Sequence, residues 1–368
     1  MKKLPQSLND WLTALAATVL GLLLSVVVVR LISSIADFIS DGEEEFMFTD
    51  IYAKVADRRS VAVLSDDVVI ASVDGCSRER IAQVIDAVSF FGPSAVGLDL
   101  FFTYPSEEGR ILASSIRDCG NIVLPVAVGR DNSSSFFYGD FPADYAAVNM
   151  ISSSTYDVIR DYVTLFKTDS VDYLSMAQAL LVKAGKEIPA ASSQERRIWY
   201  PSVDFEVIEA DDLIDEDGFP EMSAAEKLEG KIVLIGVTED LSDIHRTPVD
   251  EEMPGIMIHA HIIDTIVNDR HLHEVGPFWN ILIAVVICLL FLRLQIAMKN
   301  ILDDVGELVM RVVQLVMMYL LLVVGANLYI RHGVYVDFSI ALVMLGLSLT
   351  FLTLIKGGIY LYEKFVKK

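Results

Sequence analysis

The sequence predicts an α/β domain, with a largely parallel or mixed sheet covered by helices on both faces, joined to four transmembrane helices. Two observations predict this class. Apolar runs long enough to cross a bilayer stand at both ends of the chain, one before and three after a hydrophilic segment of about 240 residues. Within that segment, short strands that are apolar throughout alternate with helical patterns, which is typical of a parallel sheet buried on both faces.

The four apolar runs are expected to be membrane spans at residues 11–30, 278–297, 308–330 and 334–355. Lys2 and Lys3 precede the first run, and no small-residue cleavage site follows it, so an anchor is favoured over a cleaved signal peptide. Lys and Arg gather in the flanks on one side of the spans. The positive-inside rule then places segments 1–10 and 356–368 in the cytoplasm and segment 31–277 outside it. We expect a multi-pass protein of a bacterial cytoplasmic (inner) membrane.

The charge of the chain belongs to the external segment. Residues 31–277 hold 18 Lys and Arg against 45 Asp and Glu. This balance disfavours nucleic acid as a partner, because phosphate binding needs a basic face. It favours a cationic ligand or a divalent metal, although a solvated acidic surface explains the charge equally well. Three cysteines provide no disulfide framework, and Cys76 and Cys119 are expected at opposite edges of the sheet.

The elements of the external segment follow a βαβ rhythm after a polar, irregular lead-in at 31–67. We expect an exposed acidic stretch within this lead-in at 41–45. Strands are expected at 68–73, 95–100, 121–128 and 231–237, with weaker strands at 198–201 and 207–209. Helices are expected at 78–91, 110–117, 173–184 and 258–268, and residues 131–172 are expected to form loops with short strands.

Acidic residues follow three of these strands. Ligands of open parallel sheets bind outside the carboxyl ends of the strands. The candidate ligand-binding residues at that edge are Asp74, Asp99, Asp240, Asp243 and His245. Together they suit a cationic ligand or a divalent metal, and the sequence leaves the metal open. The alternatives are a turn at Asp74, a loop cap at Asp99 and an ordinary solvated surface at the acidic loop.

No catalytic residue and no cofactor are predicted. The chain has no nucleophile elbow, phosphate-binding loop, paired Cys-x-x-Cys or Gly-x-Gly-x-x-Gly motif. His259 and His261 stand two apart on a predicted helix. They should therefore point to different faces and make a poor chelate, and we interpret both as structural.

Four blocks of the external segment resemble CHASE2, a bacterial extracytoplasmic sensory domain. The first three are residues 70–74 (Ile-Ala-Ser-Val-Asp), 91–102 (Phe-Gly-Pro-Ser-Ala-Val-Gly-Leu-Asp-Leu-Phe-Phe) and 228–236 (Leu-Glu-Gly-Lys-Ile-Val-Leu-Ile-Gly). The fourth combines Asp243 and Thr247-Pro248 with residues 254–260 (Pro-Gly-Ile-Met-Ile-His-Ala). The arrangement of one span before and three after also resembles that family. The resemblance transfers no binding residue, because Asp74, Asp99 and Asp243 only coincide with its recurrent acidic positions.

The resemblance implies a sensor that passes an external signal through its spans to a cytoplasmic cyclase, kinase or diguanylate cyclase. Only thirteen residues follow position 355, so we expect the effector to be a separate chain. Tyr360, Leu361 and Phe365 suit effector docking, on an amphipathic continuation of the last span hinged at 357–358. The simpler interpretation of this tail is a basic anchor that sets the topology.

Two other classes of function stay open. The strand-end carboxylates with a metal would suit a metal-dependent envelope enzyme. A transporter or channel subunit is disfavoured, because the spans show neither an intramembrane charge pathway nor a pair of broken helices. Small residues in the spans, such as Gly325, Ala326 and Gly346, permit close helix contacts and hence a homo-oligomer.

Overall fold

The computed structural model describes residues 6–39, 48–59, 61–102, 106–129, 133–134, 144–151, 158–169 and 171–365. The chain divides into two compact units. The first, here called the membrane unit, joins Met1–Val55 to His273–Lys368. The second, the α/β unit, is Ala56–Leu272.

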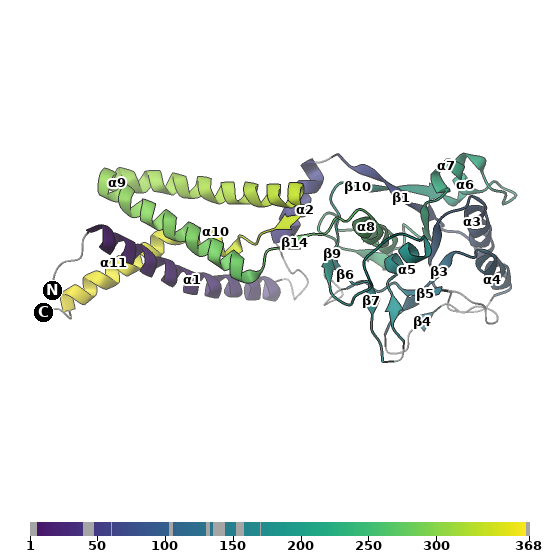
Figure 1. The fold of residues 1–368 in the computed structure, drawn as a ribbon, viewed down its shortest axis with the longest axis horizontal. Coiled ribbons are helices and arrows are strands. Elements are labelled where there is room, and N and C mark those ends of the chain that lie inside the picture. Colours follow the sequence, from purple (N-terminus) through teal and green to yellow (C-terminus); the bar gives the residue numbers. More distant parts are fainter. Residues whose placement is uncertain are drawn as a thin grey trace. The chain divides into compact units, whose positions relative to one another are not determined.

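The α/β unit is built on one mixed sheet that is mostly parallel (Figure 1). Its parallel strands lie in the order β10 (Val203–Glu209), β1 (Val63–Ser72), β11 (Ile232–Gly236), β2 (Ala95–Asp99) and β3 (Ile122–Ala127). Beyond them, β5 (Asp144–Ala147) pairs parallel with β3, and β4 (Ser133–Ser134) pairs antiparallel with it. The predicted α/β class with a largely parallel or mixed sheet is confirmed.

Strand β1 begins at Val63, earlier than the sequence pattern indicates. Its first half is largely exposed, although Ser65 and Asp67 are half-buried. Val63 and Leu64 pair only with β10, and the register then shifts before Val69. Because this half is held by backbone pairing and not by burial, no apolar pattern marks it.

Helices cover both faces of the sheet. On one face, α3 (Arg78–Phe90) and α4 (Glu108–Asp118) bury apolar side chains such as Val84, Val88 and Leu112 against β2 and β11. On the other, α5 (Met176–Lys183) and α8 (Gly255–Val267) pack on the opposite side chains of the same strands. The alternation of inward and outward residues along buried strands produces these two cores.

The expectation of an irregular lead-in at 31–67 is wrong for most of this region. Helix α1 (Gln6–Ile39) continues past Arg30, and α2 (Phe48–Arg59) forms a second helix. The mean composition of α2 is polar, but Tyr52 and Ala56 stand four apart on one buried side. A short polar helix of this kind gives a weak periodic signal. The acidic stretch at 41–45 lies outside the described residues.

Three helical segments among the described residues are long and apolar enough to cross a membrane. One is Ser7–Val28 in α1, and the other two, Pro277–Lys299 and Val305–His332, are both parts of α9. Helix α9 runs through Pro277–His332. A straight helix of 56 residues would be about 84 Å long. Its flanking strands β14 (His273–Glu274) and β15 (Val334–Tyr335) nevertheless pair in parallel, so its two ends are neighbours. The helix therefore folds back on itself, as Figure 1 shows.

The expected span at 334–355 is broken. The first two residues form β15, and the helices α10 (Ser339–Gly346) and α11 (Ser348–Phe365) are bent by 53° at Leu347. A fourth span exists only if this bent pair counts as one. A broken helix pair is therefore present, and the expected lack of broken helices no longer argues against a transporter. Helix α11 also continues through 357–358, so the hinge expected there is wrong and the bend lies at Leu347.

The side chain of Gln314 explains why the break is tolerated. Its Nε2 donates to the carbonyl oxygens of Leu345 and Gly346, at 2.7 and 3.0 Å. These carbonyls lie at the end of α10, where the helical hydrogen bonds stop. A polar side chain from α9 thus donates hydrogen bonds to carbonyls that lack helical partners at the break. The sequence around Leu347 does not predict this contact.

Small residues allow the helices of the membrane unit to approach closely. Helix α1 packs against α9, α10 and α11, with Ala14 and Ala17 fully buried. Gly21 faces the ring of Phe351, and a Cβ at Gly21 would overlap that ring. In Figure 1, α1 begins and α11 ends at the same end of this unit. All three cysteines, Cys76, Cys119 and Cys288, are free.

Candidate functional site

The carboxyl ends of β1, β11 and β2 lie side by side, as parallel pairing requires. In the register of the sheet, Ser72 of β1 stands beside Gly236 of β11, which stands beside Asp99 of β2. A Cβ at Gly236 would crowd Ile256 and Asp99, so glycine allows this close approach. The polar residues that follow the three strands therefore reach one edge of the sheet.

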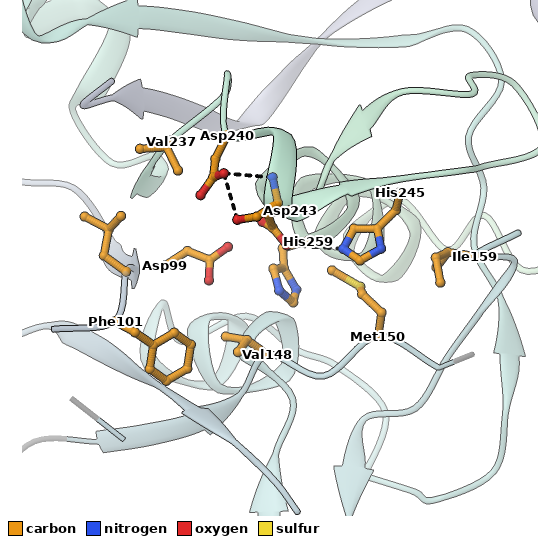
Figure 2. A pocket seen from close by; sticks show the side chains of 13 residues that line it. Asp99, Phe101, Val148, Met150, Ile159, Val237, Asp240, Asp243, His245 and His259 are labelled. Atoms are coloured by element: carbon orange, nitrogen blue, oxygen red, sulfur yellow. Dashed lines mark hydrogen bonds and ion pairs between the residues drawn. The ribbon is translucent and has the colours of Figure 1, made fainter. Parts of the chain in front are cut away.

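A cavity of about 670 Å³ opens at this edge (Figure 2). Four of the five predicted ligand-binding residues line it: Asp99, Asp240, Asp243 and His245. The remaining wall is mostly apolar and comes from segments far apart in the chain: Leu100, Phe101, Val148, Met150, Ile159 and Val237. The cavity thus combines apolar walls with convergent polar groups, and small-molecule sites commonly contain both.

Asp74, the fifth predicted residue, does not line the cavity. Its carboxylate accepts hydrogen bonds from Thr238 N and Oγ1, at 2.9 and 2.6 Å, and from Glu239 N at 3.1 Å. Ser72 Oγ lies 3.0 Å away as a further donor. Partial burial raises the pKa of Asp74, but the hydrogen bonds from Thr238, Glu239 and Ser72 outweigh it and lower the pKa overall. Asp74 therefore holds the start of the acidic loop.

Asp99 is the carboxylate that projects from the floor of the cavity. Among the described residues, no hydrogen-bond donor contacts its side chain, and Figure 2 shows it directed toward His259. Burial raises the pKa of Asp99, and the neighbouring charge of Asp243 adds to this effect. His259 and His245 act in the opposite direction, because a positive imidazolium favours the carboxylate.

The loop at 238–248 is ordered by its own side chains. Asp240 Oδ1 accepts hydrogen bonds from Ser242 N and Oγ, at 2.8 and 2.7 Å, and caps a short 3-10 helix. Asp243 Oδ1 lies 3.2 Å from His245 Nε2. The Asp243 carboxylate also lies against Gly255 at the start of α8, where a Cβ would overlap it. A helix N-terminus stabilises negative charge, so this position suits Asp243.

His259 is a lining residue that the sequence interpretation missed. Its side chain is 3 % exposed, and its Nδ1 has no hydrogen-bond partner among the described residues. It stands four residues after Gly255, so both lie on the face of α8 that meets Asp243. That spacing was the available signal, and the interpretation of the histidine pair as structural passed over it.

His261 lies on another face of α8, which confirms that the two histidines diverge. Its ring packs edge-to-face against Tyr200 and Phe205, with centroids 4.9 Å from each. Burial lowers the pKa of His261 to about 3. The side chain is therefore a neutral part of the core. Among the described residues, no three His, Cys, Asp or Glu side chains converge as a metal site.

The model of the CHASE2 domain family matches residues 19–294, three quarters of the chain. The chain belongs to the CHASE2 family. The resemblance inferred from the four sequence blocks is confirmed. No curated protein and no solved structure matches this chain.

The CHASE2 match includes the whole α/β unit, with the second half of α1 and the first part of α9. CHASE2 is a family of sensory, extracytoplasmic domains. The cavity at the carboxyl edge of the sheet therefore lies within a sensory domain. The apolar helices that precede and follow the α/β unit in the sequence are typical of a membrane protein.

The tail of this CHASE2 chain forms the end of α11. Tyr360, Leu361 and Phe365, expected to dock an effector, are 62, 54 and 70 % exposed. The Lys364 ammonium lies 5.8 Å from the Tyr360 ring centroid and 5.6 Å from that of Phe365. The tail thus continues the last helix, as expected, and presents aromatic and basic side chains together.

Proposed function

We propose that this chain is a receptor of a bacterial inner membrane that binds an extracytoplasmic ligand and reports it through its membrane helices. The observation that carries the proposal is the CHASE2 match over residues 19–294, which joins a sensory domain to membrane helices in one sequence. The excess of Lys and Arg flanking the spans supports a cytoplasmic position for both termini. The cavity lined by Asp99, Asp243 and His259 is the proposed ligand site.

Ligand binding transmits a signal only if the ligand prefers one arrangement of the protein over another. The proposed site suits this requirement, because its walls come from β2, the 238–248 loop, the segment after β5 and α8. A ligand that contacts all of them draws the loop and α8 toward Asp99. Helix α8 ends at Val267, and the chain then runs through β14 into α9. A shift of α8 is therefore delivered by the backbone to a membrane helix.

The proposed output is a separate effector chain that docks on the end of α11. Exposed Tyr360, Leu361 and Phe365 supply an apolar surface, and Lys364 beside them supplies a positive charge. Aromatic side chains are enriched at protein interfaces. A homo-oligomer through the membrane helices is compatible with this output. The sensory family fits a role without catalysis.

Orientation is tested by labelling single introduced cysteines with a membrane-impermeant maleimide. Asp217→Cys lies on the exposed surface of the α/β unit, and Glu363→Cys lies on exposed α11. The proposal expects labelling of Asp217→Cys in intact cells and of Glu363→Cys only after permeabilisation. The unmodified chain controls for the native cysteines. The opposite labelling pattern contradicts the proposed topology.

The output is tested by purifying the full chain in mild detergent. The variant Tyr360→Ala, Leu361→Ala, Phe365→Ala should lose a protein that co-purifies with the unmodified chain. Val182→Ala serves as the control, because Val182 is 56 % exposed but belongs to the α/β unit. If the triple variant retains every co-purifying protein, the docking surface is elsewhere.

A further inference from the structure

Some polar side chains of the cavity already have hydrogen-bond partners within the protein, and others do not. Asp240 is engaged by Ser242, and Asp243 is engaged by His245. Asp99 lines the same cavity, and among the described residues no donor reaches its carboxylate. A half-buried carboxylate that faces a cavity is stabilised by a donor from a ligand, and the strongest donors are positively charged.

His259 is a second and independent observation at the same place. The residue is 3 % exposed, its Nδ1 is without a partner in the described part of the chain, and its ring is directed into the cavity. Buried polar groups of native proteins are almost always hydrogen-bonded, so an unpartnered one needs an explanation. Because His259 lines the cavity, a ligand group placed between Asp99 and His259 would contact this unpartnered ring.

The apolar part of the cavity wall indicates what the rest of the ligand should be. Phe101, Met150 and Ile159 offer an apolar surface next to the acidic floor. An aromatic ring also attracts a nearby cation through its π face. A volume of about 670 Å³ lies within the range of roughly 300–1,000 Å³ for small-molecule sites. The ligand that matches both parts has a charged donor at one end and an apolar body.

We propose that this cavity binds a small organic ammonium ion, with the ammonium donating to the Asp99 carboxylate beside His259 and an apolar body lying on Phe101, Met150 and Ile159. This inference rests on the proposed sensor function and gives the ligand its chemical class. The three carboxylates of the wall disfavour an anion. A divalent ion is disfavoured because no three ligand side chains converge among the described residues.

The test compares three probes that share one skeleton but differ in charge: 2-phenylethylammonium, 2-phenylethanol and phenylacetate. Binding to the purified full chain in detergent is measured by titration calorimetry. The ammonium should bind saturably, and the alcohol should bind roughly tenfold to hundredfold more weakly, because it lacks one charge-assisted hydrogen bond. Phenylacetate should not bind. This comparison uses the unmodified chain, so it does not depend on any variant folding.

Variants then test whether Asp99 is the residue that causes the preference for the ammonium. Asp99→Asn keeps the shape of the side chain and should reduce the affinity for 2-phenylethylammonium to that for the alcohol. Asp204→Asn is the matched control, because Asp204 is an exposed carboxylate of β10 and does not line the cavity. It should leave the affinity unchanged.

Several results would overturn the ligand class. They are equal binding of the ammonium and the alcohol, no saturable binding of the ammonium, an unchanged preference in Asp99→Asn, and Asp99-dependent binding of phenylacetate. Calcium or manganese binding that excludes the ammonium would assign the site to a metal instead. None of these results affects the labelling and co-purification tests, so failure of the ligand class is distinguishable from failure of the receptor proposal.

Discussion

The carboxylate of Asp74 accepts hydrogen bonds from both the backbone N–H and the hydroxyl of Thr238. These two residues follow the neighbouring strands β1 and β11. Their contact fixes the direction in which the chain leaves β11 toward Asp240 and Asp243. The residue that the sequence suggests as a ligand contact is thus the support of the loop that carries the lining residues.

Replacing Asp74 should therefore change stability. Asp74→Ala removes the acceptor of several hydrogen bonds at a partly exposed site, so we expect a loss of about 1–3 kcal/mol in the free energy of unfolding. Because the folded pKa of Asp74 is lowered, its contribution is present above pH ~4 and is lost as the pH falls through the folded pKa. Thermal unfolding of the full chain measures both effects. Asp204→Ala, at an exposed carboxylate, should stay within about 0.5 kcal/mol of the unmodified chain.

The ring of His261 predicts a second pH dependence. Its folded pKa is about 3, whereas an unfolded histidine has a pKa of about 6.5. Below pH ~6.5 the unfolded chain therefore binds a proton that the folded chain does not, and stability falls by up to about 1.4 kcal/mol per pH unit. His261→Gln should lower stability at neutral pH but remove this slope between pH ~6.5 and ~5. An identical slope in both proteins, measured by denaturant unfolding, contradicts the prediction.

A side chain added at Gly255 should displace Asp243 or the start of α8. In Gly255→Ala the new Cβ overlaps the Asp243 carboxylate, so either that carboxylate or the first turn of α8 must move. Overpacking of this kind costs about 1–3 kcal/mol. Gly120→Ala is the matched control, because no atom lies within 4 Å of the added Cβ. Equal unfolding temperatures for the two variants would show that Asp243 is free to move away.

Gln314 should stabilise the broken helix pair. Gln314→Leu leaves the carbonyls of Leu345 and Gly346 without this donor, and we expect a loss of about 1–2 kcal/mol. The measurement is thermal unfolding of the detergent-solubilised chain. Thr353→Val removes a side-chain hydrogen bond confined to α11 and should have a smaller effect. If the two variants unfold alike, the contact at the break does not contribute to stability.

Much of the α/β unit is readable from local sequence. The apolar runs at 68–73, 95–100 and 231–237 are the strands β1, β2 and β11, because fully buried strands need apolar side chains on both faces. Adjacent parallel strands bring their carboxyl ends together. That rule alone places Asp99 and the 238–248 loop at one edge, and four of the five candidate residues line its cavity.

Other features depend on partners far along the chain. His259 lines the cavity because α8 begins beside Asp243, and the four-residue spacing from Gly255 to His259 does not by itself indicate that contact. The fold-back of α9 is evident from the pairing of β14 with β15. The break after α10 is stabilised by the side chain of Gln314. In each case the contact is made by residues far along the chain, so the sequence next to the feature does not predict it.

The sequence by itself determined the α/β class, the apolar helices, the acidic charge and the edge at which ligand groups gather. It could do so because the spacing of apolar residues reports local burial. Only the tertiary structure decided which carboxylate supports the loop and which faces the cavity. Asp74 and Thr238 are 164 residues apart, and whether a carboxylate finds donors depends on which distant backbone the fold places beside it.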